Sequence, residues 1–206
     1  MKRGFVLILT APSGGGKGAL SRHLLKNVED IRFSVSTTTR PMRPGEVDGV
    51  HYFFVGRNEF ENMIREGAFI EWAEVFGNFY GTSQSVLSRD LEAGWDVILD
   101  IDWQGARQIH ERMPGDVVHV AIIPPSLEEL RRRLIERGQD GEEVIQRRMA
   151  LAGRELSHWR EADYVIVNDR LELACAEIEA IVRAERLKKG RVGRRIERLL
   201  TRFVLR

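Results

Sequence analysis

The sequence predicts an α/β protein built on a parallel sheet, and three observations support this class. Short apolar runs rich in β-branched residues alternate with segments of helical periodicity. A glycine-rich turn separates the first apolar run from the first helical segment. About sixty residues lie between the second and third apolar runs, which is too long for a simple crossover. We therefore expect a three-layer core that carries an inserted mixed α+β segment.

The apolar runs and the helical periodicity give the expected order of elements. The strands of the main sheet are expected at residues 5–10, 33–37, 97–101, 117–123 and 164–167. Helices are expected at 18–27, 126–137, 142–157 and 170–188. Ser126 and Glu129 have the spacing of a capping box, in which the hydroxyl caps the helix and the carboxylate reaches back. The sequence thus predicts where the second of these helices begins after its strand.

The insertion is expected to span residues 36–90. It contains a strand pattern at 51–55, a helical pattern at 59–66 and aromatic runs at 69–72 and 76–80. These patterns predict a small subdomain with its own strands and helix rather than a loop.

Composition excludes several classes of protein. The chain has 206 residues, of which 43% are hydrophobic and 31% are charged, so a single folded core is expected and extensive disorder is not. The longest strongly apolar run, residues 5–9, is too short to cross a bilayer, so we expect no membrane span and a cytoplasmic location. The single cysteine, Cys175, excludes an intrachain disulfide.

The formal net charge of +1 hides an asymmetry along the chain. From Arg183 to the end there are ten Lys or Arg residues and two acids, which leaves a body of about −7. Residues 190–206 are interpreted as a basic extension, with Ile196, Leu199, Leu200 and Phe203 at helical spacing. A solvated basic helix is one interpretation, and weak binding to polyanions such as nucleic acid or lipid headgroups is the alternative.

The glycine-rich turn at residues 11–19 has the sequence Ala-Pro-Ser-Gly-Gly-Gly-Lys-Gly-Ala. Such a turn between a strand and a helix directs backbone N–H groups toward a polyphosphate, and Lys17 supplies a mobile cation. The match is imperfect, because Ala11 replaces the first glycine and neither Gly18 nor Ala19 has the hydroxyl that usually ligates Mg²⁺. The turn nevertheless indicates a phosphate-binding site.

The turn also allows two alternatives to a polyphosphate site. The run from Gly14 to Ala19 also fits the dinucleotide fingerprint G-x-G-x-x-A, which requires an acid at the end of the second strand to hold a ribose. That strand is followed by Ser-Val-Ser-Thr-Thr at 34–38, with no acid. A purely structural glycine turn remains the simpler alternative. The lysine in a strand–turn–helix context favours phosphate.

A second group of cations follows the second strand. Arg40 and Arg43 lie three residues apart in a proline-containing segment that is not helical. Guanidinium groups match phosphate oxygens in a bidentate manner, so this segment indicates a second anion site. Tyr52 and Tyr80 are candidate hydroxyl donors to it. The alternative is an ordinary solvated basic turn.

Acids and arginines later in the chain suit the chemistry of phosphoryl transfer. The strand at 97–101 delivers Asp100 and Asp102 to the carboxyl edge of the sheet, where Mg²⁺–nucleotide sites are found. Arginines at 131–133, 137 and 147–148 flank a stretch that begins and ends with glycine, and they suit a mobile lid. For some of these arginines, helix-surface pairing with Glu128, Glu129 or Glu136 is the alternative.

Taken together, these blocks resemble the guanylate kinase family over nearly the whole chain, to about residue 188. The resemblance is carried by six stretches, at residues 12–18, 36–46, 69–73, 77–82, 98–105 and 165–169. It implies a P-loop core formed by 1–35 and 91–189 with a lid at about 133–150, and a GMP-binding subdomain at 36–90. The implied reaction is reversible transfer of the ATP γ-phosphate to GMP or dGMP, with Mg²⁺ as cofactor.

The resemblance also implies a role for each site residue. ATP would be bound by Ala11, Pro12, Ser13, Gly14, Gly15, Gly16, Lys17, Gly18, Ala19 and, near adenine, Asn168. GMP would be bound by Ser36, Arg40, Arg43, Tyr52, Glu71, Tyr80, Thr82 and Asp102. Lys17, Arg40, Arg133, Arg137 and Arg148 would neutralise the transferring group, and Asp100 would hold Mg²⁺ through bound water.

Two alternatives for function stay open at this point. One is a non-catalytic guanylate-kinase-like module that grips a phosphorylated partner, although such a module is expected to lose Lys17 and the lid arginines that this chain keeps. The other is a kinase for a different phosphorylated small molecule. Glu71 together with Thr82 argues for guanine, because a buried carboxylate can accept both guanine donors, N1–H and N2–H₂.

Overall fold

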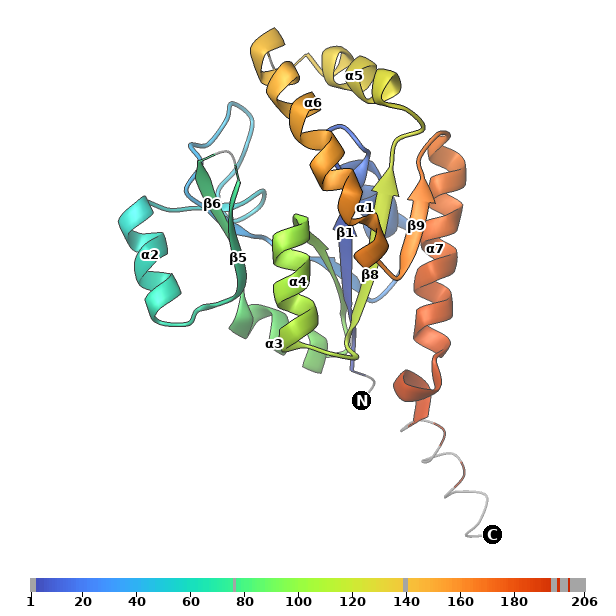
Figure 1. The fold of residues 1–206 in the computed structure, drawn as a ribbon. Coiled ribbons are helices and arrows are strands. Elements are labelled where there is room, and N and C mark those ends of the chain that lie inside the picture. The colour runs from blue at the N-terminus through green and yellow to red at the C-terminus, as the bar shows by residue number, and fades with distance from the viewer. Residues whose placement is uncertain (1–2, 76, 139–140, 194–195, 197–199, 201–206) are drawn as a thin grey trace.

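The computed structural model describes residues 3–75, 77–138, 141–193, 196 and 200. Its main sheet has five parallel strands in the order β2-β7-β1-β8-β9 (Figure 1). The strands are β1 (Val6–Thr10), β2 (Ile31–Phe33), β7 (Asp96–Asp100), β8 (Val117–Ile123) and β9 (Tyr164–Val167). The predicted α/β class with a parallel sheet is confirmed.

Helices cover both faces of this sheet and form its two apolar layers. On one face, α1 (Lys17–Asn27) and α7 (Leu171–Leu187) pack over a cluster that includes Leu7 and Leu9. On the other face, α3 (Gln84–Glu92) and α4 (Trp103–Arg112) pack over Val6 and Ile8. Alternate residues of β1 therefore enter opposite layers, because side chains along a strand alternate between its faces. All four side chains are fully buried.

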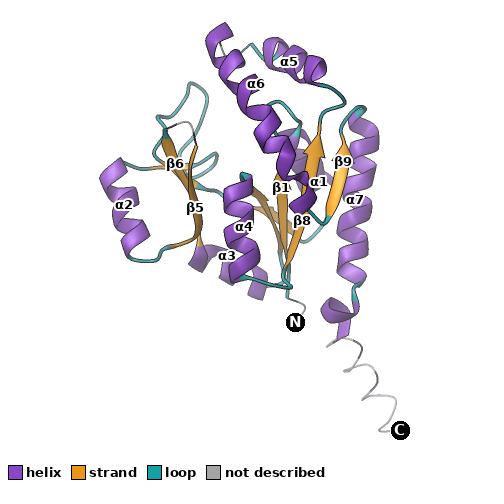
Figure 2. Cartoon of the chain, in the orientation of Figure 1, coloured by secondary structure: helices purple, strands orange, loops and turns teal. Residues whose placement is uncertain are grey.

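A second, mixed sheet lies beside the first and carries its own small core (Figure 2). It has the order β4-β3-β6-β5, formed by β3 (Thr37–Thr38), β4 (Phe53–Phe54), β5 (Phe69–Val75) and β6 (Asn78–Ser83). Helix α2 (Arg57–Arg65) places Phe60 between Phe69 and Phe79, at ring-centroid distances of 4.5 and 5.4 Å. These stacked rings are the centre of a third apolar cluster, which belongs to the second sheet.

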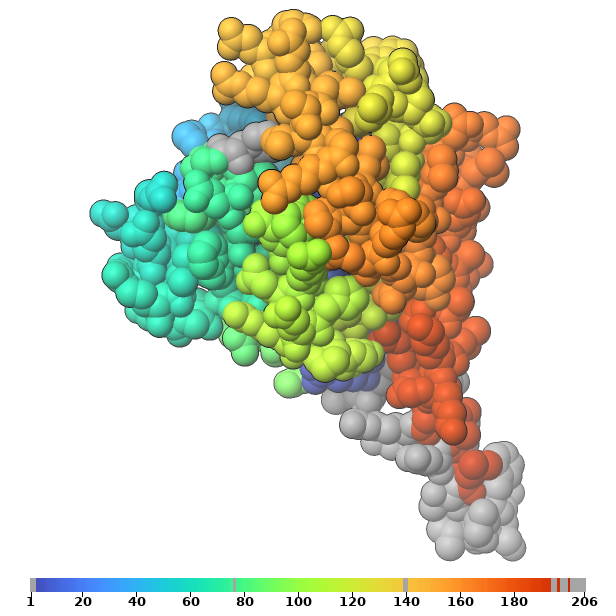
Figure 3. Space-filling view, viewed as in Figure 1, coloured from blue at the N-terminus to red at the C-terminus, as the bar shows by residue number. Residues whose placement is uncertain are grey.

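The second-sheet segment and the end of α7 extend from opposite parts of the molecule (Figure 3). Between β8 and β9 the chain forms α5 (Leu127–Glu136), α6 (Glu142–Ser157) and the short 3₁₀ helix η1 (His158–Glu161). Helices α5 and α6 lie near the carboxyl end of β8 (Figure 1). An ion pair at 2.8 Å joins Arg131 of α5 to Glu142 of α6.

Most expected elements are present, but two local predictions are wrong. The single strand expected at 33–37 is two strands in different sheets, because the chain leaves the first sheet after Phe33 and pairs in the second sheet from Thr37. The capping box is half formed: Ser126 Oγ accepts from the Glu129 N–H at 3.1 Å. The Glu129 carboxylate instead accepts hydrogen bonds from Arg132 and Arg133. Helix α3 spans residue 90, the expected end of the insertion, and its Leu87 and Leu91 are buried in the main core.

The start of the basic C-terminal segment is held against the body by ion pairs. Arg186 Nε lies 2.6 Å from the buried Asp96 carboxylate. The fully buried Glu185 faces Lys188 at 2.7 Å and Arg191 at 3.5 Å. Arg186 is therefore matched by an acid of the body, and Lys188 and Arg191 are matched by an acid of the segment itself. A count of net charge along the chain cannot show these pairings.

The rest of the C-terminal segment is described only in part. Residues 189–193 are helical, and Ile196 and Leu200 are exposed. Leu199 and Phe203, which were predicted to share a helix face with them, lie outside the described residues. Among the helices that the structure describes, none is long and apolar enough to cross a membrane.

A buried histidine links the centre of the sheet to the start of the glycine-rich turn. His119 on β8 is 2% exposed, and its Nε2 is hydrogen bonded to Thr10 Oγ1 at 2.8 Å. Burial, together with the neighbouring His110, lowers the pKa of His119 from 6.5 to about 4. The imidazole is therefore held neutral in the folded protein at pH values at which it is protonated in the unfolded chain.

This shift predicts a specific pH dependence of stability. Because the unfolded chain binds a proton at His119 near pH 6.5 and the folded one only near pH 4, acidification from pH 7 to pH 5 should remove about 2 kcal/mol of stability through this residue. His119→Gln keeps a partner for Thr10 and removes the titration. We expect the difference in unfolding free energy between wild type and variant, measured in urea, to shift by about that amount toward the variant at pH 5. A difference independent of pH would contradict the neutral buried histidine.

Candidate active site

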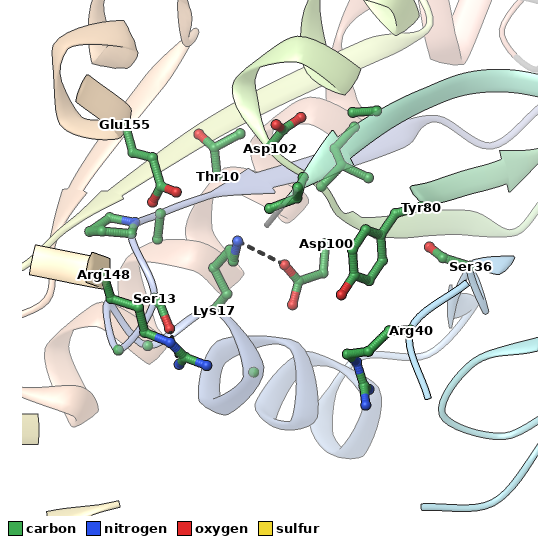
Figure 4. A pocket seen from close by; sticks show the side chains of 18 of the residues that line it. Thr10, Ser13, Lys17, Ser36, Arg40, Tyr80, Asp100, Asp102, Arg148 and Glu155 are labelled. Atoms are coloured by element: carbon green, nitrogen blue, oxygen red, sulfur yellow. Dashed lines mark hydrogen bonds and ion pairs between the residues drawn. The ribbon is translucent and has the colours of Figure 1, made fainter. Parts of the chain in front are cut away.

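One large cavity lies where the main sheet, the second sheet and α6 meet (Figure 4). Its volume is about 1030 Å³, which is large enough for more than one small ligand. The predicted site residues that line it come from segments far apart in the sequence. They are Ala11, Pro12, Ser13, Gly14, Gly16, Lys17, Gly18, Ala19, Ser36, Arg40, Arg43, Tyr52, Glu71, Tyr80, Asp100, Asp102, Arg133, Arg137 and Arg148.

The remaining predicted site residues lie just behind this lining. Thr82 is fully buried and donates a hydrogen bond to Glu71. Asn168 is 4% exposed and its Nδ2 donates to the Gly15 carbonyl at 2.9 Å. Asn168 thus supports the glycine-rich turn from the side away from the cavity. Gly15 takes part through its backbone carbonyl, which accepts this hydrogen bond.

The glycine-rich turn has the conformation that its composition predicts. Gly14 and Gly16 have φ values of 89° and 109°, in the left-handed region that favours glycine. Helix α1 begins at Lys17, directly after Gly16, and no described side chain caps it. The N-terminal N–H groups of this helix therefore meet the cavity, where a helix N-terminus attracts an anion.

Lys17 and Asp100 form the central ion pair of the cavity (Figure 4). Lys17 Nζ lies 3.0 Å from Asp100 Oδ1. Both side chains are partly accessible, at 22% and 33% exposure. The parallel pairing of β1 with β7 sets Leu9 opposite Asp100, so the turn that follows β1 starts beside this carboxylate. The lysine thus has a counter-ion when no phosphate is bound.

Arginines of the α5–α6 region approach the turn from the other side. Arg148 on α6 donates from Nη1 to Ser13 Oγ at 2.6 Å. Arg133 on α5 is paired with Glu129 at 2.7 Å and also donates to the Asn168 carbonyl at 2.9 Å. Arg133 therefore makes one ion pair on the surface of its own helix, as the alternative interpretation expects, and one contact outside it. For Arg132 the alternative accounts for every described ion pair, because these are with Glu129 and Glu136 of the same helix.

The second cationic group sits across the cavity, next to the second sheet. Arg40 Nη2 lies 2.7 Å from Glu46 Oε1, and its guanidinium is 5.3 Å from the centre of the Tyr52 ring. The Tyr52 and Tyr80 rings meet edge to face at 5.9 Å. The hydrogen bond from Arg40 lowers the pKa of Glu46, so this acid stays charged and orients the arginine.

A buried carboxylate, Glu71, projects from β5 into the same cavity. The side chain is 3% exposed, and burial raises its pKa to about 7 despite the hydrogen bond from Thr82. Gly105 makes room for it, because a Cβ atom at that position would stand 2.6 Å from Glu71 Oε2. Asp102 lies beside it and caps α4 by accepting from the Gly105 N–H at 2.9 Å. This corner offers a ligand acceptors rather than donors.

Several cavity residues were not predicted from the sequence. Glu155 on α6 faces Lys17 and Arg148, and burial raises its pKa (Figure 4). Its spacing of seven residues from Arg148, two helical turns, was a usable signal, since both residues fall in the expected helix 142–157. Glu46, Arg22 and Arg147 also line the cavity. Their positions depend on contacts between elements that no local pattern predicts.

The cavity suits a divalent cation only in the presence of a ligand. Asp100, Asp102 and Glu155 supply carboxylate oxygens to it, which Mg²⁺ prefers. No cluster of three His, Cys, Asp or Glu residues that could hold a metal occurs among the described residues. Mg²⁺ usually binds through one or two carboxylates together with substrate phosphates and water, so the donor set fits this mode.

The fold and the cavity define a class of protein. A strand–turn–helix phosphate site, a lysine paired with an acid from the adjacent parallel strand and a second cationic group across one cavity belong to a P-loop phosphotransferase with two anionic substrates. Residues of both cationic groups line this one cavity, and Figure 4 shows Arg40 on the opposite side of Asp100 from Lys17 and Arg148.

Comparison with known proteins gives the particular family. The family model described as guanylate kinase matches residues 3–185. Guanylate kinases of Sphingopyxis alaskensis and Salmonella typhi are each 52% identical to this chain, over 190 and 206 residues. The first match covers 92% of this chain and 86% of the relative, and the second covers 99% of both. The chain belongs to the guanylate kinase family.

The structural comparison agrees. The crystal structure of guanylate kinase from Anaplasma phagocytophilum superposes with a TM-score of 0.81 at 42% identity, covering 98% of this chain and 97% of that one. The family model ends at residue 185, near the expected end of the resemblance at about residue 188. The match to the Salmonella typhi relative covers 99% of this chain and so extends into the basic C-terminal segment.

The packing around Gly16 yields a prediction about stability. A Cβ at Gly16 would stand 2.1 Å from Asn168 Nδ2, whereas Gly115 has a similar φ of 92° with no atom within 4 Å of its Cβ position. Gly115→Ala should cost about 1–2 kcal/mol through backbone strain alone. Gly16→Ala should cost about 1–3 kcal/mol more, since Asn168 must leave the Gly15 carbonyl. Urea unfolding of both variants checks this, and equal losses would contradict the bracing role of Asn168.

Proposed function

We propose that the chain transfers the γ-phosphoryl group of MgATP reversibly to GMP or dGMP, giving ADP and GDP or dGDP. As a guanylate kinase it is an ATP-dependent nucleoside monophosphate kinase. The observation that carries the choice of acceptor is the buried Glu71, which lies in the same cavity as Lys17.

On the donor side, the proposal places the ATP phosphates in the turn at residues 11–19. The backbone N–H groups at the start of α1 and the Lys17 ammonium are the groups that can bind them. Asn168 would contribute by fixing the shape of the turn, which its hydrogen bond to Gly15 supports. Mg²⁺ would be held by Asp100 through water and by phosphate oxygens, and it would supply charge neutralisation at the β- and γ-phosphates.

On the acceptor side, the proposal places the GMP phosphate near Arg40, Arg43, Tyr52 and Tyr80. Arg40 is held in position by Glu46, and its guanidinium group can donate two parallel hydrogen bonds to a phosphate. Burial raises the pKa of Tyr52, so the phenol stays protonated and can donate to a phosphate oxygen. We assign this group to phosphate binding because it lies across the cavity from Lys17.

Guanine would be recognised at the Glu71 corner, with Ser36, Thr82 and Asp102 nearby. Guanine presents N1–H and N2–H₂ as donors, and a carboxylate accepts both, whereas adenine has an acceptor at N1. With adenine the buried carboxylate would face another acceptor, and such unpaired groups discriminate strongly. Thr82 already occupies Glu71 Oε1, which fixes the orientation of the remaining acceptors.

The chemistry would rest on positioning and charge. Lys17, Arg133, Arg137 and Arg148 would surround the migrating phosphoryl group after α5 and α6 close over the turn. The carboxylates paired with the cations would be replaced by phosphate oxygens. No covalent intermediate is required, because an in-line transfer between two bound nucleotides needs alignment and electrostatic stabilisation.

The proposed assignment divides the chain as follows. Residues 1–35 and 91–189 form the phosphate-binding core with a lid at about 133–150, and 36–90 bind the acceptor. We retain cytoplasmic location and weak polyanion binding by residues 190–206 as predictions. The non-catalytic alternative is disfavoured because Lys17, Arg133, Arg137 and Arg148 all line the cavity.

The choice of substrate is tested by an acceptor panel. ADP formation from MgATP is measured in a coupled assay with GMP, dGMP, AMP, UMP and CMP. We expect kcat/KM for GMP to exceed that for AMP by about 1000-fold or more, because adenine leaves Glu71 without a donor. Absence of ADP formation with every acceptor would contradict a kinase, and equal rates with AMP would contradict guanine selection.

The role of Glu71 is tested by an isosteric change with a control on the same strand. Glu71→Gln should lower kcat/KM for GMP by about 100-fold or more, since one of two acceptors becomes a donor. The unfolding free energy at pH 8 should not fall. Burial raises the pKa of Glu71 from 4.5 to about 7, so the loss of stability from this carboxyl begins above pH 4.5 and is complete above about pH 7.

The matched control is Glu74→Gln, an exposed acid on the same strand β5, which should leave kinetics unchanged. Wild-type kinetics in Glu71→Gln would remove Glu71 from the site. An equal loss in Glu74→Gln would point to a general effect of charge.

A further inference from the structure

The first turn of α1 lacks the hydroxyl that normally follows a P-loop lysine. Gly18 and Ala19 occupy the two positions after Lys17, and neither side chain can donate to a phosphate or ligate a metal. The family match is nonetheless strong across this region. The donor phosphates therefore lack one expected contact at this point.

The side chain of Arg22 lies next to Gly18, where the hydroxyl is missing. It follows Gly18 by four residues on α1, and side chains four apart on a helix share one face and lean toward its N-terminus. Arg22 Nη1 stands 3.4 Å from the position that a Cβ at Gly18 would take. Arg22 also lines the cavity together with Gly16, Lys17 and Gly18. The guanidinium thus reaches back along the helix toward the phosphate turn.

The charge of Arg22 is not neutralised by the described part of the chain. Within the described residues, no hydrogen bond, ion pair or ring contact involves its side chain, which is exposed. Arg40, by contrast, is paired with Glu46 and Arg133 with Glu129. A guanidinium on a cavity wall with no acid beside it is available to an anionic ligand.

We propose that Arg22 is an additional ATP-binding residue that donates to an oxygen of the donor polyphosphate from the α1 side. This inference rests on the proposed function for the identity of the ligand. An N–H donor cannot ligate Mg²⁺, so Arg22 replaces the phosphate contact of the absent hydroxyl and not its metal contact. The small size of Gly18 is part of the arrangement, because a larger residue there would occupy the path of the guanidinium.

The first test is charge removal with a control on the same helix. Arg22→Gln should raise KM for MgATP by about tenfold, the usual effect of losing one charge-assisted hydrogen bond, and leave KM for GMP within about twofold. Lys26→Gln removes the same charge from the last turn of α1, away from the cavity, and should change neither constant. Arg22→Lys should recover part of the loss. An unchanged KM for MgATP in Arg22→Gln, or an equal rise in Lys26→Gln, would overturn the proposal.

The second test uses the space above Gly18. Gly18→Ser restores a hydroxyl at the usual place, with its Cβ in contact with the guanidinium. Arg22→Gln should therefore raise KM for MgATP less in the Gly18→Ser background than in the wild type. We expect the two fold-increases in KM to differ by about threefold or more. Strict additivity would show that the two positions do not serve the same contact.

Binding of MgADP by calorimetry separates this inference from the proposed reaction. An Arg22→Gln loss of MgADP affinity in a protein that phosphorylates no acceptor would support Arg22 and refute the kinase. Normal guanylate kinase activity with unchanged MgADP affinity in Arg22→Gln would support the kinase and refute the role of Arg22.

Discussion

The parallel pairing of β1 with β7 is the constraint on which the rest of the site depends. It sets the end of one buried strand beside the end of another, so that the turn after Leu9 starts next to Asp100. Helix α1 must then begin beside that carboxylate, and Lys17 meets it at 3.0 Å. The apolar residues of both strands fix this register, because a slip of one residue would turn the buried Val6 and Ile8 into the opposite layer.

The cations of the cavity are held by pairs of opposite charge. Lys17 faces Asp100, Arg40 faces Glu46 and Arg133 faces Glu129. Such pairing limits the repulsion among cations that the reaction requires, and it keeps their side chains directed into the cavity. Phosphate oxygens can then exchange with the carboxylates. This arrangement also explains how a chain of net charge +1 can hold a cationic site.

The corner around Glu71, which we propose to bind the base, shows the opposite balance, because the arrangement proposed for binding lowers the stability of the fold. Glu71 is buried beside Asp102, and its raised pKa reflects the cost of holding a carboxylate there. Gly105 tolerates this approach only because it has no Cβ. The hydrogen bond from Thr82 compensates in part. A site of this kind keeps its acceptors poorly satisfied until a ligand with complementary donors arrives.

The sequence by itself determined the α/β class and the glycine-rich turn, since these follow from local periodicity and from a motif with a direct chemical role. Its resemblance to guanylate kinases indicated several further cavity residues, such as Ser36 and Glu71. Tertiary structure decided the rest. The strand expected at 33–37 divides because Thr37 pairs in another sheet, and no local pattern carries that choice. The positions of Glu155 and Asn168 in the site depend on contacts with residues far along the chain, such as Lys17 for Glu155 and Gly15 for Asn168. Contacts between residues far apart in the chain depend on how the elements pack together, and local patterns in a single sequence do not contain that information.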